Sequence, residues 1–443
     1  MALILGLVAV QLLLVGWYLY RSGQIFQWQK GVTVISLVQG EKRAELNPYG
    51  PGFERELMQQ FARHRDVRLQ WREVSSWEEA RSLLFSGRAE ILLAPGTPPP
   101  SWDMQELVAG PAFRQAPSLL VHHRQRFGLR SIYDLCRIPV HIPNIPVFET
   151  FLTASDFDVP CRPDIVKRQS PGLQNLLQFM QTEEARFAVV DKQRYQAWAP
   201  FYPQVRQTYV FPQTADIAFR WYWHREAAAT GEALATFWNR SEQKQQLRRL
   251  QELYTGFFPA QPDYYELAHL SKAVREKLQR YLPTIRRAAE EHGLDPLWLV
   301  AMIYQESHFE AHAESYTGVR GLMQLTKPTA RELGIKNRRD PKQSILGGAR
   351  YVKYLWQRLE GHDLSAWGRW FLALAAYNQG FSHAENALRL TENLGKDPRF
   401  WGDIKSVFPL LSYNRYHTQF EAGGARGFEA MDYVQSIRWY YYV

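Results

Sequence analysis

Hydrophobic and polar positions follow two different periods in the first half of the chain. Strands are predicted where short apolar or β-branched runs occur, at residues 32–38, 67–71, 89–94, 118–121, 140–142, 187–190 and 217–223. Helices are predicted where apolar side chains recur at helical spacing, at residues 52–64, 77–85, 173–181 and 231–254. Strands that alternate with helices favour a parallel sheet covered by helices. The pattern predicts two α/β lobes, with the chain returning to the first lobe near its end.

The second half of the chain has only helical patterns. Residues 259–270 are rich in Pro and Tyr and are expected to form a linker. An amphipathic helix is predicted at residues 271–292, interrupted by Pro283 and closed by Gly293. Asp-Pro pairs at 295–296 and 340–341 are typical of helix starts. We therefore expect a multidomain protein, with an α/β domain at residues 30–258 and a mostly α-helical domain at 271–443.

The N-terminal segment predicts the compartment. Residues 2–20 are almost wholly apolar and are followed by Arg21, a length that can span a bilayer. Residues 1–22 are therefore expected to be a signal peptide or a membrane anchor. The choice between the two stays open, because a good small-residue cleavage site is hard to find. Either alternative places the rest of the chain in an exported, periplasmic location.

Charge and cysteine content restrict the partners. A net charge of +9 suits a polyanion such as an acidic membrane or a cell wall rich in carboxylates, although a solvated basic surface explains it equally well. No nucleic-acid-binding signature is present, so nucleic acid is the least favoured partner. The two cysteines, Cys136 and Cys161, are too few for a Cys-pair metal site and could form one disulfide in an exported protein.

Glu306 is the candidate catalytic residue. The helix that starts at Asp295 is apolar on every face from Leu297 to Tyr304, so we expect it to be buried all round. A carboxyl at the end of such a helix is partly desolvated, which raises its pKa and lets it donate a proton near neutrality. Taken alone, Glu306 is better explained as the point where the helix reaches solvent.

Four segments in order strengthen the catalytic interpretation. They are Glu306-Ser307, Gly321-Leu322-Met323-Gln324, Ala376-Tyr377-Asn378 and Tyr433. In order and spacing they resemble the motifs of the family 1 lytic transglycosylases, which have a goose-lysozyme-like helical fold and cut peptidoglycan. The resemblance covers about residues 270–443. The loop at 317–321, the segment at 347–351 and the segment at 424–427 resemble a membrane-bound branch of that family.

The resemblance implies a reaction that needs one carboxyl. Glu306 would protonate the bond between N-acetylmuramic acid and N-acetylglucosamine, and then accept the proton of the muramic acid C6 hydroxyl, which closes on C1. By the same resemblance, Ser307 would orient Glu306 or the substrate, Met323 and Gln324 would line the sugar site, and Tyr377, Asn378 and Tyr433 would complete it. Met323 and Tyr377 could instead be simple core residues. The resemblance implies no metal and no organic cofactor.

Ordinary glycosidases use two carboxylates, and three other acids stand near Glu306 in the sequence. Glu310 would share the face of Glu306 if the helix continued, and Glu314 and Glu332 are the other nearby acids. Each is better explained as a surface charge, which favours lytic over hydrolytic cleavage. A hydrolase of the same fold and a non-catalytic cell-wall sensor remain the alternatives.

The upstream domain resembles the periplasmic solute-binding proteins. Relatives of that kind that bind amino acids clamp the carboxylate with an Arg, which is missing from the segment at residues 96–103. Asp191 stands where such relatives place the acid that binds the amino group. The domain is interpreted as regulatory, with a muropeptide or an amino-acid-like molecule as its possible ligand. The alternative is a scaffold that only spaces the catalytic domain from the membrane. The family resemblance implies peripheral association with the outer membrane, and an uncleaved N-terminal helix would anchor the protein instead.

Overall fold

The computed structural model describes residues 31–37, 47–74, 76–126, 128, 130–143, 148–149, 152, 161–168, 173–182, 184–212, 216–259 and 263–443. The chain forms two compact units. Unit 1 runs to Leu247 apart from a short excursion, and unit 2 comprises residues 47–50 and 248–443. The excursion brings Tyr49 into the core of unit 2, where it is buried.

The first sheet of unit 1 is mixed. Its strands are β1 (Val32–Leu37), β2 (Leu69–Val74), β3 (Ile91–Pro95), β4 (Leu107–Ala109), β5 (Arg114–Ala116) and β11 (Ile217–His224). Their order is β2-β1-β3-β11-β4, and β5 also pairs with β11. Strand β1 runs parallel to β2 and β3, whereas β11 runs antiparallel to β3, β4 and β5. The chain therefore returns to the first sheet through β11, after the second sheet is complete.

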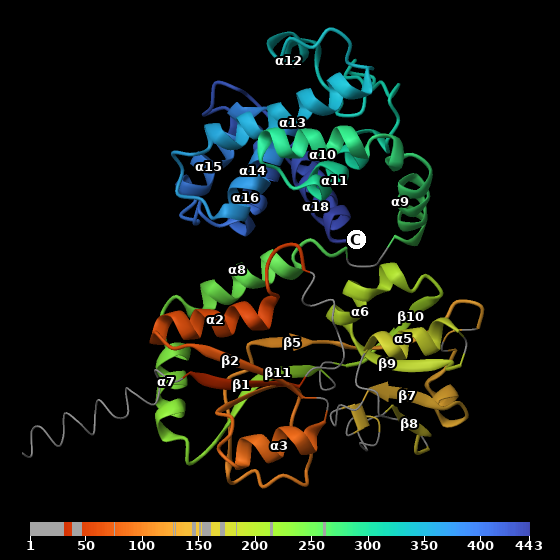
Figure 1. Cartoon of the computed structure of the whole chain (residues 1–443), viewed down its shortest axis with the longest axis vertical. Coiled ribbons are helices and arrows are strands. Elements are labelled where there is room, and N and C mark those ends of the chain that lie inside the picture. The colour runs from red at the N-terminus through yellow and green to blue at the C-terminus, as the bar shows by residue number, and fades with distance from the viewer. Residues whose placement is uncertain are drawn as a thin grey trace, which may run out of the picture. The chain divides into compact units, whose positions relative to one another are not determined.

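Helices cover both faces of the first sheet (Figure 1). They are α2 (Phe53–Arg65), α3 (Trp77–Phe85) and α7 (Ala228–Trp238). On one face, Trp221 of β11 packs against Phe61 of α2 and Phe237 of α7. The next residue of β11, Tyr222, points to the other face and joins the core of α3. This alternation of side chains along β11 buries both of its faces.

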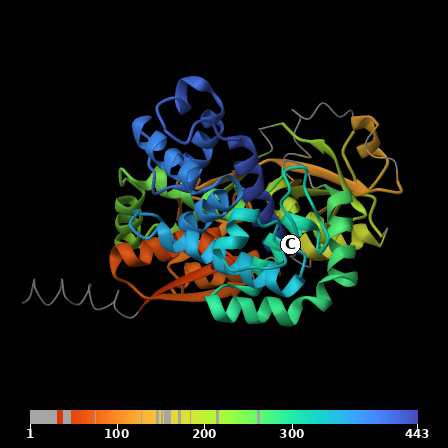
Figure 2. The ribbon, with the colours of Figure 1, turned by 90° about the horizontal axis from the view of Figure 1, so that it is seen from above.

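The second sheet forms the other lobe of unit 1. Its strands are β6 (Ser118–His123), β7 (Val140–Pro143), β8 (Ile165–Arg168), β9 (Phe187–Asp191) and β10 (Val205–Val210), in the order β10-β6-β9-β7-β8. It is accompanied by α5 (Leu173–Gln181), α6 (Lys192–Trp198) and the 3-10 helices η2 (Ile132–Cys136) and η3 (Ala199–Phe201). The two sheets lie side by side in both views (Figures 1 and 2).

The predicted fold class, two α/β lobes followed by a helical domain, is confirmed. The expectation of a parallel sheet is wrong in part, because the returning strand β11 enters the first sheet antiparallel. Strands β4, β5, β8 and β10 and helix α6 were not predicted. All four strands are only three to six residues long, and in β10 the positions between its ends are half-buried rather than alternating.

Cys136 and Cys161 form a disulfide, the pairing that the sequence left open. The bridge closes a segment of 25 residues that contains β7 and ends shortly before β8. A cross-link of this length restricts the unfolded chain and contributes about 3 kcal/mol to the free energy of unfolding.

We expect the double variant C136S/C161S to lower the thermal midpoint of unit 1, as measured by calorimetry on the full chain. A reductant should shift the wild-type midpoint in the same direction and leave the double variant unchanged. Equal midpoints for the wild type and the double variant would show that the bridge contributes nothing to stability.

Unit 2 is helical. Its helices are α8 (Gln243–Thr255), within which the division of the chain falls, α9 (Tyr264–Glu276), α10 (Leu282–His292), α11 (Pro296–Ser307), α12 (Lys327–Glu332), α13 (Pro341–Arg358), α14 (Ala366–Gln379), α15 (Phe381–Asn393), α16 (Trp401–Val407), α17 (Asn414–His417) and α18 (Gly427–Tyr442). Two 3-10 helices, η5 (Leu278–Arg280) and η6 (Phe408–Ser412), connect them. Helix α11 packs against α10 and α18, and α14 packs against α13, α15 and α18 (Figure 1).

Two expectations for this half need correction. Helix α9 begins at Tyr264, inside the expected linker 259–270, because Asp263 caps it by accepting from the amides of Tyr265 and Glu266. The helix predicted at 271–292 is two helices, and Pro283 stands in the first turn of α10 rather than inside a continuous helix. Gly293 ends α10 in the left-handed conformation, as predicted.

Among the described residues, no helix combines the length and apolar character needed to cross a bilayer. The predicted signal peptide or anchor at residues 1–22 lies outside them.

Candidate active site

Helix α11 begins and ends at defined residues. The Asp295 carboxylate accepts from the amide of Leu297 at 2.8 Å, which confirms the predicted N-cap. The helix ends after Ser307 because His308 and Phe309 both adopt positive φ, at 49° and 61°. Two consecutive left-handed residues without glycine are strained, and burial of the Phe309 ring offsets that cost. The helix is not buried all round as expected, since Leu297 is 63% exposed.

Glu306 lies on the last turn of α11 and remains partly accessible. Its apolar surroundings disfavour the charged carboxylate and raise the pKa of Glu306 to about 8. The Tyr433 hydroxyl donates a hydrogen bond to Glu306 Oε1 at 2.5 Å, which lowers the pKa by less than desolvation raises it. Glu306 is thus an acid that is still protonated at neutral pH and can give up a proton near that pH.

The raised pKa of Glu306 predicts that the stability of the variant E306Q relative to the wild type increases as the pH rises above 4.5. The folded state favours the protonated acid, so folding is penalised once the unfolded chain loses that proton. The penalty grows from about pH 4.5 and is complete near pH 8, where it amounts to a few kcal/mol. Denaturant unfolding of both proteins at acid and at alkaline pH measures it. Equal stability differences at both pH values would contradict it.

Ser307 connects α11 to the loop that follows it. Its buried hydroxyl lies 3.1 Å from the carbonyl of Ile303 and 3.0 Å from the carbonyl of Leu322. The hydroxyl therefore faces backbone groups rather than the Glu306 carboxyl. This contact holds the segment at residues 321–325 against the end of the catalytic helix.

Met323 and Gln324 hold that segment in place. Met323 is fully buried against α13, where a Cβ on Gly348 would lie only 2.6 Å from the Met323 side chain. Its amide donates to the Ser344 hydroxyl at 3.1 Å. Gln324 has a φ of 45°, and its side-chain amide donates to the carbonyls of Gly321 (2.8 Å) and Ala313 (3.2 Å). This close approach explains Gly348, whereas a Cβ on the neighbouring Gly347 would overlap the Ile335 side chain.

Tyr377 and Tyr433 bring two further helices to Glu306. The Tyr377 hydroxyl on α14 donates to the Met323 carbonyl at 2.8 Å. Burial raises the pKa values of both tyrosines, and the nearby Glu306 charge raises them further. Both hydroxyls therefore stay protonated and act only as donors or neutral contacts. Asn378 follows at the end of α14, where its side-chain oxygen accepts from Gln379 at 2.7 Å.

The candidate second carboxylates lie in surface ion pairs. Glu310 does not share the face of Glu306, because α11 has already ended, and it pairs with Lys277. Glu314 pairs with Arg320 and Arg339, and Glu332 is exposed. The ion pairs lower the pKa values of Glu310 and Glu314, so these two groups are ionised at neutral pH. Within the described ranges, no group of His, Cys, Asp or Glu side chains is arranged to hold a metal ion.

Asp191 lies in unit 1, at the end of β9. Its carboxylate caps α6 by accepting from the amide of Arg194 at 3.0 Å. The side chains of Arg194 and Arg114 lie 3.6 and 4.0 Å from its two oxygens. Arg114 also donates to Gln193 at 2.8 Å. The carboxylate proposed to bind an amino group therefore already has two cations beside it.

Sequence reasoning missed Ser344, which holds Met323, and the buried pair of Glu252 and Arg438 described below. Neither carries a local signal. Ser344 is an ordinary residue in the first turn of α13, and Arg438 stands alone among aromatic residues near the end of the chain.

Comparison with known proteins identifies the family to which the chain belongs. Residues 283–400 match the family model of the transglycosylase SLT domain. The chain is 32% identical over 392 residues to the membrane-bound lytic murein transglycosylase F of Shewanella pealeana, covering 88% of this chain and 80% of that protein. The protein of the same name from Marinobacter nauticus is 33% identical, with 88% and 76% covered. The chain belongs to the membrane-bound lytic murein transglycosylase F family. As a member of it, the chain is a lytic transglycosylase.

The SLT match contains the first three of the four predicted site segments, while the fourth, Tyr433, lies beyond it. Solved structures similar to about half of the chain include a histidine kinase sensor domain with similarity to periplasmic binding proteins (16% identity, TM-score 0.41, covering 52% of this chain and 98% of that one). Another is the substrate binding protein of an amino acid ABC transporter (12% identity, TM-score 0.41, covering 51% and 99%).

Proposed function

We propose that this lytic transglycosylase cleaves the β-1,4 bond between N-acetylmuramic acid and N-acetylglucosamine in peptidoglycan without water, leaving 1,6-anhydromuramic ends. Glu306 is the single acid and base of this reaction. One observation carries the proposal: Glu306 has a pKa of about 8 and a tyrosine on its carboxyl, while Glu310 and Glu314 are held in ion pairs at the surface.

The reaction balances with one carboxyl. Glu306 gives its proton to the glycosidic oxygen as the bond from that oxygen to the muramic acid C1 breaks. The C6 hydroxyl of the same sugar then attacks C1 and gives its proton to the Glu306 carboxylate, which regenerates the acid. The nucleophile belongs to the substrate, so its attack is intramolecular and has a large entropic advantage. No second carboxylate is needed to activate water.

The neighbouring residues have supporting roles in this proposal. Tyr433 donates to Glu306 and steadies its charged form between the two proton transfers. Ser307, Met323 and Tyr377 hold the 321–325 segment and α14 against the end of α11, so they position the sugar site through backbone contacts. Gln324 and Asn378 are partly exposed and are the proposed contacts to the sugar.

Mass spectrometry of digested peptidoglycan tests the reaction. Muropeptides with 1,6-anhydro ends are expected, formed without incorporation of oxygen from ¹⁸O-labelled water. Reducing ends labelled with ¹⁸O would instead identify a hydrolase of the same fold. Absence of both products from wild-type digests would leave a non-catalytic sensor.

The reaction rate should fall as the pH rises through about 8. The first step needs protonated Glu306, and the raised pKa keeps that form dominant below pH 8. Initial rates of anhydro-product formation between about pH 4 and about pH 10 measure this alkaline limb. A rate that falls already near pH 4.5, the ordinary pKa of Glu, would show that Glu306 is not desolvated in the working enzyme.

The upstream domain is proposed to be regulatory and to bind a muropeptide or amino-acid-like ligand, with Asp191 in its site. The proposed division is residues 30–258 for this domain and 271–443 for catalysis, with α9 beginning in the segment between them. Equilibrium dialysis with labelled muropeptides, compared between the wild type and D191N, tests the ligand. Equal binding by both would remove Asp191 from the site.

We place the protein on the periplasmic face, associated with the outer membrane or anchored by residues 1–22.

A further inference from the structure

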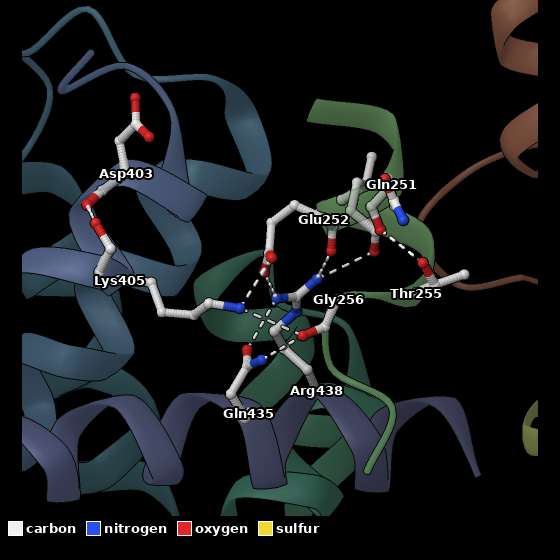
Figure 3. A network of polar contacts seen from close by, with 10 residues as sticks. Gln251, Glu252, Thr255, Gly256, Asp403, Lys405, Gln435 and Arg438 are labelled. Atoms are coloured by element: carbon white, nitrogen blue, oxygen red, sulfur yellow. Dashed lines mark hydrogen bonds and ion pairs between the residues drawn. The ribbon is translucent and has the colours of Figure 1, made fainter. Parts of the chain in front are cut away.

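A buried cation lies on the same helix as Tyr433. Arg438 follows Tyr433 by five residues on α18, and its side chain is fully buried. One guanidinium nitrogen donates to the Glu252 carboxylate at 2.7 Å and to Gln435 at 2.9 Å. The other donates to the backbone carbonyls of Glu252 at 2.6 Å and Leu253 at 3.1 Å (Figure 3).

Apart from the contact to Gln435, which lies on α18 itself, these contacts reach the last turn of α8. Carbonyl groups at a helix C-terminus lack intrahelical partners and carry partial negative charge, so cations bind there favourably. Gln435 donates to the Gly256 carbonyl at 2.6 Å, and Lys405 of α16 contacts Gly256 and the Glu252 carboxylate (Figure 3). The end of α8 is therefore a polar anchor inside unit 2, fixed from both α18 and α16.

Aromatic rings enclose the Arg438 side chain. The guanidinium carbon lies 4.3 Å from the ring centre of Phe371 and 4.8 Å from that of Phe257. Tyr49 closes the remaining side, and its hydroxyl donates to the backbone carbonyl of Arg438 at 2.8 Å. Both the side chain and the backbone of Arg438 are thus held in place.

We propose that Arg438 is a positioning residue for the Glu306–Tyr433 pair: its clamp on the last turn of α8 fixes α18 where the Tyr433 hydroxyl reaches Glu306. The inference rests on the proposed function of Glu306. Helix α18 also packs against α11 and α14, and the Tyr440 and Tyr441 hydroxyls near its end donate to Glu266 and Asp295, but these two contacts are at least partly exposed, whereas the Arg438 side chain is fully buried. Five residues of helix span about 7.5 Å, so a shift at Arg438 moves Tyr433 as part of one stiff element. A hydrogen bond weakens steeply with such a shift.

The variant E252Q tests this inference. It removes the charge that pairs with Arg438 but keeps the shape of the side chain. The Tyr433 hydrogen bond holds the pKa of Glu306 below the value that burial alone would give, so loosening α18 should raise it. We expect the alkaline limb of the pH–rate profile to move upward by about one pH unit. Y433F should shift it in the same direction, and E252Q/Y433F no further than Y433F alone.

The matched control is R249M. Arg249 lies one turn before Glu252 on α8 and forms an ion pair with Asp397, which is not on α18. R249M and E252Q should lower the thermal midpoint similarly, but only E252Q should move the alkaline limb. If both variants lower the midpoint and neither moves the limb, Arg438 supports the fold alone and the proposal is wrong.

A second measurement separates this outcome from failure of the proposed function. Infrared difference titration of the wild type against E306Q reads the pKa of Glu306 without turnover. A higher Glu306 pKa in E252Q than in the wild type supports the positioning role even if wild-type digests show no anhydro product. An unchanged pKa in E252Q overturns it. R438K should give the same upward shift, because one ammonium cannot replace the fork that binds a carboxylate and two carbonyls.

Discussion

The variant E306Q is expected to form 1,6-anhydro products about 10²–10⁴-fold more slowly than the wild type, the usual contribution of a positioned acid–base group. Glutamine keeps the size of the side chain and can still accept the Tyr433 hydrogen bond, but its amide is not an acid and cannot protonate the glycosidic oxygen. Because Glu306 serves in both proton transfers of the proposed reaction, no other group in the site replaces it. Muropeptide release from purified cell walls, quantified by liquid chromatography, measures the loss.

The matched control for this prediction is E310Q. Glu310 stands four residues later, is exposed and pairs with Lys277, so its removal should change the rate by less than about twofold. The difference between the two variants isolates chemistry from a general loss of negative charge near the end of α11. If E306Q clears peptidoglycan as fast as the wild type, Glu306 is not the acid.

The contrast between Glu306 and Glu310 shows where sequence reasoning succeeds and where it stops. Asp295-Pro296 predicts the start of α11 correctly, because side-chain capping and the fixed φ of proline act within a few residues. The end of the helix has no such signal. His308 and Phe309 are neither glycine nor asparagine, and tertiary packing of the Phe309 ring imposes their left-handed backbone.

Of two long-range contacts, the sequence likewise predicts one and gives no indication of the other. The order of the motifs predicts that Tyr433 belongs with Glu306, and the structure brings their side chains into a hydrogen bond across 127 residues of sequence. The sequence contains no comparable indication that Arg438 reaches back to Glu252, 186 residues earlier. A buried ion pair is specified by two ordinary residue types that only the complete fold brings together. Its partners become visible once α8 and α18 are placed.

Replacing Gly321 by Ala is expected to be the most destabilising single change in the catalytic loop. Gly321 has a φ of 82°, where an L-residue costs about 1–2 kcal/mol. Its new Cβ would also overlap the backbone carbonyl oxygen of Arg338, and forced repacking costs about 1–3 kcal/mol more. Arg338 has little freedom to move away, because its side chain donates to the carbonyls of Gly318 and Leu325. Thermal and denaturant unfolding of the full chain measure the loss.

Gly318 provides the matched control, because it lies in the same loop with a φ of 79° and has open space where a Cβ would stand. G318A therefore carries the backbone strain without the overlap, and the difference between the two variants measures the close approach to Arg338. G321A should also slow product formation more than G318A does. Relief of the overlap moves the 321–325 segment, and with it the Leu322 and Met323 carbonyls that Ser307 and Tyr377 contact. Equal stability and equal rates for the two variants would mean that the loop adapts freely, and the segment would then be too pliable to position a sugar beside Glu306.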